Sequence, residues 1–235
     1  MFERPTEVIV NPARAEVTNA FMRGVYLWMA IGLAVTAFFA YGTLAFAPLR
    51  SLVFSSQYTF YGLLIAEVLL VVGLSAAIHK LSGFAATGMF ILYSTLNGMT
   101  LSVLLLVYTS QSIFTAFLTT AGMFGAMSVY GLVTKRDLTG MGSFMMMGLF
   151  GIIIAMVVNM FVGSSALDLG ISILGVFIFL GLTAYDTQAL RNMGESAPMD
   201  DALAIRRGTI LGALKLYLDF INIFIMLLRL FGDRR

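Results

Sequence analysis

The sequence predicts an all-α membrane protein with seven transmembrane helices. Of its 235 residues, 60% are hydrophobic and only 11% are charged, whereas soluble domains carry about 25% charged residues. The apolar residues form uninterrupted runs of about 20 residues, the length that a helix needs to cross a hydrocarbon core. Segments such as FMMMGLFGIIIAMVV do not alternate, which disfavours a β-barrel, and a soluble bundle of this size could not bury so much apolar surface.

Seven segments fit this description. We expect a single seven-helix transmembrane domain at 25–231, between an N-terminal tail at 1–24 and a C-terminal tail at 232–235. All four prolines fall outside the predicted spans, as helix interiors require. Small residues at helix-packing spacing in the fourth span, Ala121, Gly122, Gly125 and Ala126, predict close packing inside the bundle. The predicted spans are residues 25–47, 59–78, 84–107, 112–133, 141–162, 169–190 and 209–231.

The distribution of basic residues predicts the orientation of the chain. The N-terminal tail and alternate loops carry Arg4, Arg14, Arg23, Lys80, Lys135, Arg136, Arg191, Arg206 and Arg207. The opposite side carries Arg50, Arg229, Arg234 and Arg235. The positive-inside rule therefore places the N-terminus in the cytoplasm. Seven crossings then put the C-terminus outside, whereas a re-entrant last segment would return it to the cytoplasm.

Composition also excludes several classes of function. The chain has no cysteine, which excludes disulfides, thiol catalysis and cysteine-based metal sites. Its net charge of +2 is spread over short loops, so nucleic-acid binding has no support. The partner that the sequence does predict is membrane lipid, and nothing in it predicts a tightly bound cofactor.

Three acidic residues lie inside the predicted spans: Glu67, Asp186 and Asp219. An ionisable residue in a membrane helix is costly, and it usually faces a partner, the bundle interior or a water-filled path. Glu67 stands alone in LLIAEVLLVV. We expect it to meet a basic residue from another helix, to be protonated, or to line an aqueous path.

Asp186 and Asp219 lie on consecutive antiparallel spans and are expected to meet. Two carboxylates in contact do not both ionise cheaply, so such a pair shares a proton and titrates as a unit. The pair could also bind a hard cation such as Ca²⁺, which prefers oxygen ligands. The sixth span ends in the polar segment GLTAYDTQ, in which Asp186 follows Tyr185. The alternative for Asp186 is therefore an interfacial acid beside a belt tyrosine.

Basic partners for the aspartates come from two places. Lys215 precedes Asp219 by four residues and Asn222 follows it by three, so the three side chains share one helix face. A local Lys215–Asp219 pair that neutralises itself is one interpretation, and it implies that removing Asp219 would free Lys215. His79 and Lys80 end the second span, at the membrane level expected for Asp186, and are candidates for a latch that closes onto it.

Three segments carry a resemblance to a known family. GLTAYDTQ, LYLDFINIFIMLLRLFG and TAGMFGAMSVYGLVTKRDLTG resemble the transmembrane Bax inhibitor motif family in its bacterial branch. The resemblance implies a seven-helix fold with the last helix central, and a location in the bacterial inner membrane. It also implies a pH-sensitive calcium leak with a diaspartyl sensor at Asp186 and Asp219, together with the family's glutamate at Glu67. The family's basic latch falls in AAIHKLSG, which offers His79 and Lys80 but no arginine.

Three functions are therefore weighed. The leading one is a Ca²⁺ leak channel gated by protons on the aspartate pair, with Ca²⁺ as the transported ion. The alternative is a regulator that binds another membrane protein, such as a membrane protease. The remote alternative is an intramembrane aspartyl protease, but bulky Leu216, Tyr217 and Leu218 precede Asp219 where a substrate backbone must approach. We therefore expect no enzyme activity, and the sequence does not set the oligomeric state.

Overall fold

The computed structural model describes residues 12–198 and 201–235. It is 89% helical, with seven long helices and one short one. Each of the seven long helices is long and apolar enough to cross a membrane, which confirms the predicted fold class. The helices are α1 (Pro12–Ala45), α2 (Ala47–Phe54), α3 (Gln57–Ala77), α4 (Gly83–Val107), α5 (Ser110–Val133), α6 (Thr139–Val162), α7 (Ser165–Ser196) and α8 (Ala202–Phe231).

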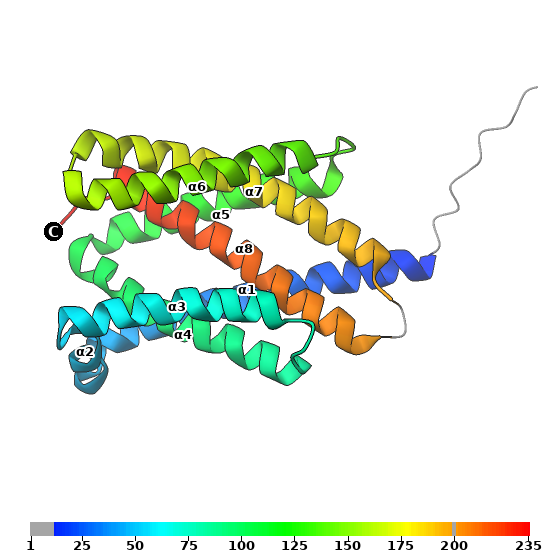
Figure 1. Ribbon diagram of the computed structural model, residues 1–235, viewed down its shortest axis with the longest axis horizontal. Helices are drawn as coiled ribbons and strands as arrows, with labels where there is room; N and C mark the ends of the chain where they lie inside the picture. Colours follow the sequence, from blue (N-terminus) through cyan, green and yellow to red (C-terminus); the bar gives the residue numbers. More distant parts are fainter. Residues whose placement is uncertain (1–11, 199–200) are drawn as a thin grey trace, which may run out of the picture.

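The last helix runs through the middle of the bundle. In Figure 1, α8 crosses diagonally between α6 and α7 on one side and α3 and α4 on the other. It packs against α1, α4, α5 and α7, and Leu216, Tyr217 and Ile223 are completely buried along it. Thirty residues give α8 a length of about 45 Å, enough to span a bilayer. The central position expected for the last helix is therefore confirmed.

Hydroxyl side chains and one glycine mark where the helices begin and end. A serine or threonine side chain accepts a hydrogen bond from the first turn of α3, α4, α5 and α7, at Ser56, Ser82, Thr109 and Ser164 respectively. Each satisfies a backbone amide that would otherwise lack a partner. Gly163 ends α6 with φ of 64°, a left-handed conformation that glycine adopts without steric cost. These local signals explain why the connections between neighbouring spans are short.

Three helices, α1, α7 and α8, extend well beyond their predicted apolar spans. The predicted start of the first helix at residue 25 is wrong, because α1 begins at Pro12; residues 1–11 of the predicted tail lie outside the described residues. Polar residues such as Glu16 and Asn19 end the apolar run, yet Phe21 is buried and packs against Gly194 of α7 and Gly208 of α8. Tertiary contacts therefore continue the helix. The predicted 191–208 loop likewise shrinks, because α7 continues to Ser196 and α8 begins at Ala202.

Two glycines set the closest approaches between helices. A Cβ at Gly98 of α4 would lie 2.5 Å from the Thr36 carbonyl oxygen of α1, and one at Gly131 of α5 would lie 2.4 Å from the Ala184 carbonyl oxygen of α7. The internal packing predicted for the small residues of the fourth span is wrong. A Cβ at Gly122 or Gly125 would meet no atom within 4 Å, because this stripe faces outward from α5.

Candidate functional site

The two aspartates predicted to meet lie on facing sides of α7 and α8. Asp186 is 8% exposed and Asp219 is 4% exposed, and Lys215, one helical turn before Asp219 on α8, contacts Asp186 of α7, so both carboxylates lie in the same region of the α7–α8 contact. The Asp219 Oδ2 is buried without a hydrogen-bond partner among the described residues. An ionised carboxylate in this position would carry a large desolvation cost. The pair is therefore an acidic centre inside the bundle, with Asp219 the deeper member.

One lysine faces the pair. The Lys215 Nζ lies 3.3 Å from the Asp186 Oδ1, and Lys215 stands one helical turn before Asp219 on α8. The local Lys215–Asp219 ion pair is therefore not the contact formed, and removing Asp219 would not leave the lysine without a partner. The Lys215 side chain remains 45% exposed, whereas that of Asp186 is 12% exposed. The ion pair thus joins α8 to α7 at the edge of the acidic centre.

Two polar neighbours of the aspartates have other contacts. Asn222 donates to the Leu218 carbonyl of its own helix at 2.8 Å and does not extend the charged face. The Tyr185 ring packs where a side chain at Gly142 of α6 would otherwise lie, so it supports the α6–α7 contact. Neither residue is part of the acidic centre in this conformation.

Glu67 forms a separate buried cluster with α4. The Glu67 residue is 7% exposed. Asn97 Nδ2 donates to Glu67 Oε2 at 3.0 Å, and Thr100 Oγ1 donates to Glu67 Oε1 at 2.7 Å. The partner of Glu67 is therefore an amide and a hydroxyl rather than the basic residue that was one of the expectations. Both oxygens of the carboxylate are occupied, which reduces the cost of burying it.

The cluster continues across the bundle through Tyr217 of α8. The Tyr217 hydroxyl donates to Asn97 Oδ1 at 2.8 Å and lies 2.6 Å from Thr36 Oγ1 of α1. Thr36 also lies 3.0 Å from the Ser94 carbonyl. Two hydroxyl protons thus serve three contacts. When Thr36 donates to the Tyr217 hydroxyl, each group donates to the next: Thr36 to Tyr217, Tyr217 to Asn97, and Asn97 to Glu67.

Known proteins match the chain over almost its full length. Residues 18–235 match the family described as inhibitor of apoptosis-promoting Bax1. The chain belongs to this family. It is 50% identical over 230 residues to the inner membrane protein YbhL of Escherichia coli strain K12, covering 98% of this chain and 97% of that protein.

More distant bacterial relatives cover the chain nearly as well. An uncharacterized protein of Deinococcus radiodurans is 48% identical over 216 residues, covering 92% of this chain and 91% of that protein. An uncharacterized membrane protein of Streptococcus pyogenes serotype M1 is 38% identical over 220 residues, covering 91% and 93%. The Bax inhibitor family member described here is accordingly an integral membrane protein, as its helices and its relatives' names both indicate.

The latch predicted at the end of the second span is not seen in this conformation. His79 and Lys80 lie in the exposed turn after α3, and among the described residues neither forms an ion pair with an aspartate. Lys215 occupies that position instead. The turn is tied elsewhere, because Arg207 of α8 donates to the Leu81 carbonyl at 2.6 Å. The cation facing Asp186 therefore comes from the neighbouring helix rather than from the second span.

Sequence reasoning missed the residues that surround Glu67. Asn97 and Thr100 stand in LYSTLNGMT, a polar stretch within an otherwise apolar helix, and that contrast was the available signal. Tyr217 was noted only as a bulky neighbour of Asp219. Which of these polar groups meet Glu67 depends on the rotation of α4 and α8, and the sequence does not specify that rotation.

Proposed function

We propose that this Bax inhibitor family member is a pH-sensitive Ca²⁺ leak channel gated by the proton shared between Asp186 and Asp219. The observation that supports the proposal is the burial of both carboxylates between α7 and α8, with Lys215 of α8 in contact with Asp186 of α7. The family resemblance selects calcium over other cations.

The charge balance of this trio explains how pH would act. With one shared proton, the two aspartates carry one negative charge, which the Lys215 ammonium offsets. Loss of that proton leaves two anions facing one cation, and a divalent cation entering between them would restore the balance. The ion pair between Lys215 and Asp186 also connects α7 to α8, so a change in its charge changes the force that holds these helices together.

The donor set fits a passing ion better than a stored one. Ca²⁺ takes six to eight oxygen ligands, and two carboxylates supply only part of that number. The described residues contain no group of three or more acidic or histidine side chains that could hold a metal ion. In the proposed mechanism water therefore completes the coordination, and Ca²⁺ contacts Asp186 and Asp219 only in transit.

Glu67 has a different place in the proposal. It is buried in its own cluster with α4 and is assigned to the ion path rather than to the pH sensor. Its replacement by glutamine is expected to alter conductance or selectivity while the pH response remains. We further propose that the chain lies in the inner membrane with its N-terminus on the cytoplasmic side, as the distribution of basic residues favours; reporter fusions at each connection would test this orientation.

The decisive experiment is Ca²⁺ flux into liposomes that contain only the purified protein. Flux is measured over a pH series for wild type, Asp186→Asn, Asp219→Asn and Glu67→Gln. Either aspartate variant is expected to lose the pH response, because the coupled titration needs both carboxylates, whereas Glu67→Gln keeps it. An unchanged pH profile in both aspartate variants would rule out the sensor. Absence of flux from folded wild type would favour the regulator that acts through a membrane-protein partner.

A further inference from the structure

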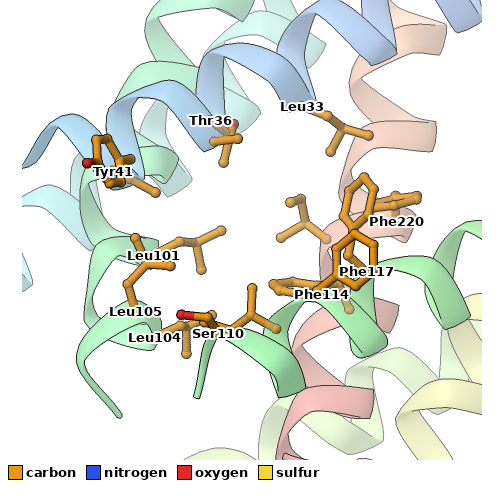
Figure 2. Close-up of a pocket in the computed structure, with 15 residues that line it drawn as sticks. Leu33, Thr36, Tyr41, Leu101, Leu104, Leu105, Ser110, Phe114, Phe117 and Phe220 are labelled. Atoms are coloured by element: carbon orange, nitrogen blue, oxygen red, sulfur yellow. The ribbon is translucent and has the colours of Figure 1, made fainter. Parts of the chain in front are cut away.

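An apolar pocket opens between four helices, away from the acidic residues. It has a volume of about 420 Å³ and is enclosed by side chains of α1, α4, α5 and α8. In Figure 2, Thr36 and Leu33 of α1 line one edge of the pocket, Phe220 and Phe117 line the side next to Leu33, and Ser110 lies opposite α1. A volume in this range is typical of pockets that hold a small apolar ligand, about 300–1,000 Å³.

The pocket is open sideways, toward the surface that faces lipid. Two of its lining residues, Tyr41 of α1 and Phe114 of α5, are 73% and 62% exposed. In a chain whose long helices cross the bilayer, that exposure is to hydrocarbon rather than to water. From Leu33 to Tyr41 the α1 wall rises by about 12 Å, close to half of a hydrocarbon core of about 30 Å. The pocket therefore extends through most of one lipid leaflet, which is about 15 Å thick.

A basic group is held at the end of the pocket nearest the α4–α5 connection. Arg235 donates from Nη2 to Ser110 Oγ at 3.3 Å, and Ser110 lines the pocket. The backbone fixes this position, because the Arg235 amide donates to the Val107 carbonyl at 2.9 Å and the Thr109 amide donates to the Asp233 carbonyl at 3.1 Å. The exposed side chains here are Asp233, Arg234 and Arg235. A guanidinium thus stands where the apolar wall ends.

We propose that this pocket binds a phospholipid, with one acyl chain among the apolar side chains and the phosphate beside Arg235. Three observations point to this occupant: the lateral opening, the leaflet-length apolar wall, and an arginine at the level where a headgroup would lie. Arginine binds phosphate through charge-assisted hydrogen bonds. The wall includes Thr36, whose hydroxyl contacts Tyr217, so a bound acyl chain would touch α1, α4 and α8, which carry Thr36, Asn97 and Tyr217 of the Glu67 cluster.

Two alanines of α1 provide a matched test. Ala37 lines the pocket, whereas Ala30, seven residues earlier, is exposed on the same helix but is not part of the lining. Protein purified in mild detergent is examined by native mass spectrometry. Wild type and Ala30→Phe are expected to retain one phospholipid, and Ala37→Phe to retain at least tenfold less. Arg235→Gln should also reduce the retained fraction. Equal retention by the two phenylalanine variants would overturn the proposal, as would a retained second copy or a non-lipid molecule.

A second measurement detects the bound lipid directly and does not need the Ala37→Phe variant. Trp28 is the only tryptophan, so in a Trp28→Phe background a single new tryptophan serves as the fluorescent reporter. It is introduced either in the pocket, by Phe114→Trp, or outside it on α6, by Phe144→Trp, where Phe144 is 66% exposed. Phospholipid with brominated acyl chains is titrated into detergent-solubilised protein. Fluorescence of the reporter at 114 is expected to be quenched near one lipid per protein, and that of the reporter at 144 only at large excess. Quenching of both reporters at the same lipid ratio would contradict a specific site.

Discussion

Replacing Glu67 with glutamine and with leucine separates the hydrogen bonds of its cluster from its charge. Glutamine keeps every contact between α3 and α4. Its amide oxygen accepts from Asn97 Nδ2, and its amide nitrogen donates to Thr100 Oγ1. The Thr100 proton can turn to the Asn97 carbonyl oxygen, which lies 3.0 Å away. The free energy of unfolding of Glu67→Gln should therefore be close to that of wild type.

Leucine removes both acceptor oxygens. Thr100 keeps its contact with the Asn97 carbonyl, but Asn97 Nδ2 is left buried without an acceptor, since Asn97 is only 7% exposed. Leaving a buried polar group unpaired costs about 1–3 kcal/mol, whereas single interhelical hydrogen bonds in membrane proteins contribute about 0.6 kcal/mol on average. We therefore expect Glu67→Leu to be about 1–3 kcal/mol less stable than Glu67→Gln. The small average for interhelical hydrogen bonds in membrane proteins favours the lower end of this range.

The assay uses the single tryptophan of the chain. The Arg206 guanidinium carbon of α8 lies 4.5 Å from the centre of the Trp28 ring of α1. The fluorescence of Trp28 therefore reports the separation of α1 from α8. Unfolding by SDS in mixed micelles gives the free energy for wild type and both variants. If the leucine variant is as stable as the glutamine variant, or if glutamine is as harmful as leucine, hydrogen bonding does not hold this cluster together.

Three further predictions follow from single contacts. Tyr217→Phe should lower the free energy of unfolding by about 1–3 kcal/mol, because it leaves a buried amide oxygen without its donor; the same SDS assay measures it, and a wild-type value would contradict the assigned bond. Gly98→Ala should cost about 1–3 kcal/mol because its Cβ meets a backbone oxygen, whereas Gly122→Ala, which points into open space, should not destabilise; equal effects would contradict the packing. Lys215→Met should change the pH profile of Ca²⁺ flux and the matched exposed-lysine variant Lys80→Met should not; the reverse result would restore the latch to the second span.

The positions of the membrane spans could be predicted from the sequence because lipid imposes a local requirement. A segment of about 20 apolar residues buries its side chains in hydrocarbon whatever its neighbours are. Most predicted ends consequently agree with the structure to within a few residues. The ends that failed, at the start of α1 and around the 191–208 loop, contain polar residues, and there contacts such as Phe21 against α7 and α8 continue the helices.

The acidic residues of interest were likewise evident from the sequence alone, because a carboxylate inside an apolar span is costly enough to need a reason. Their partners were not. Lys215 and Asp219 share a helix face by spacing, yet the lysine reaches Asp186 across to α7, and Glu67 meets Asn97 and Thr100 of α4 instead of a basic residue. Helical spacing constrains the neighbours within one helix, whereas the rotation and closeness of separate helices decide the contacts between them. Those quantities follow from packing at positions such as Gly98 and from the central place of α8, and only the tertiary structure determines them.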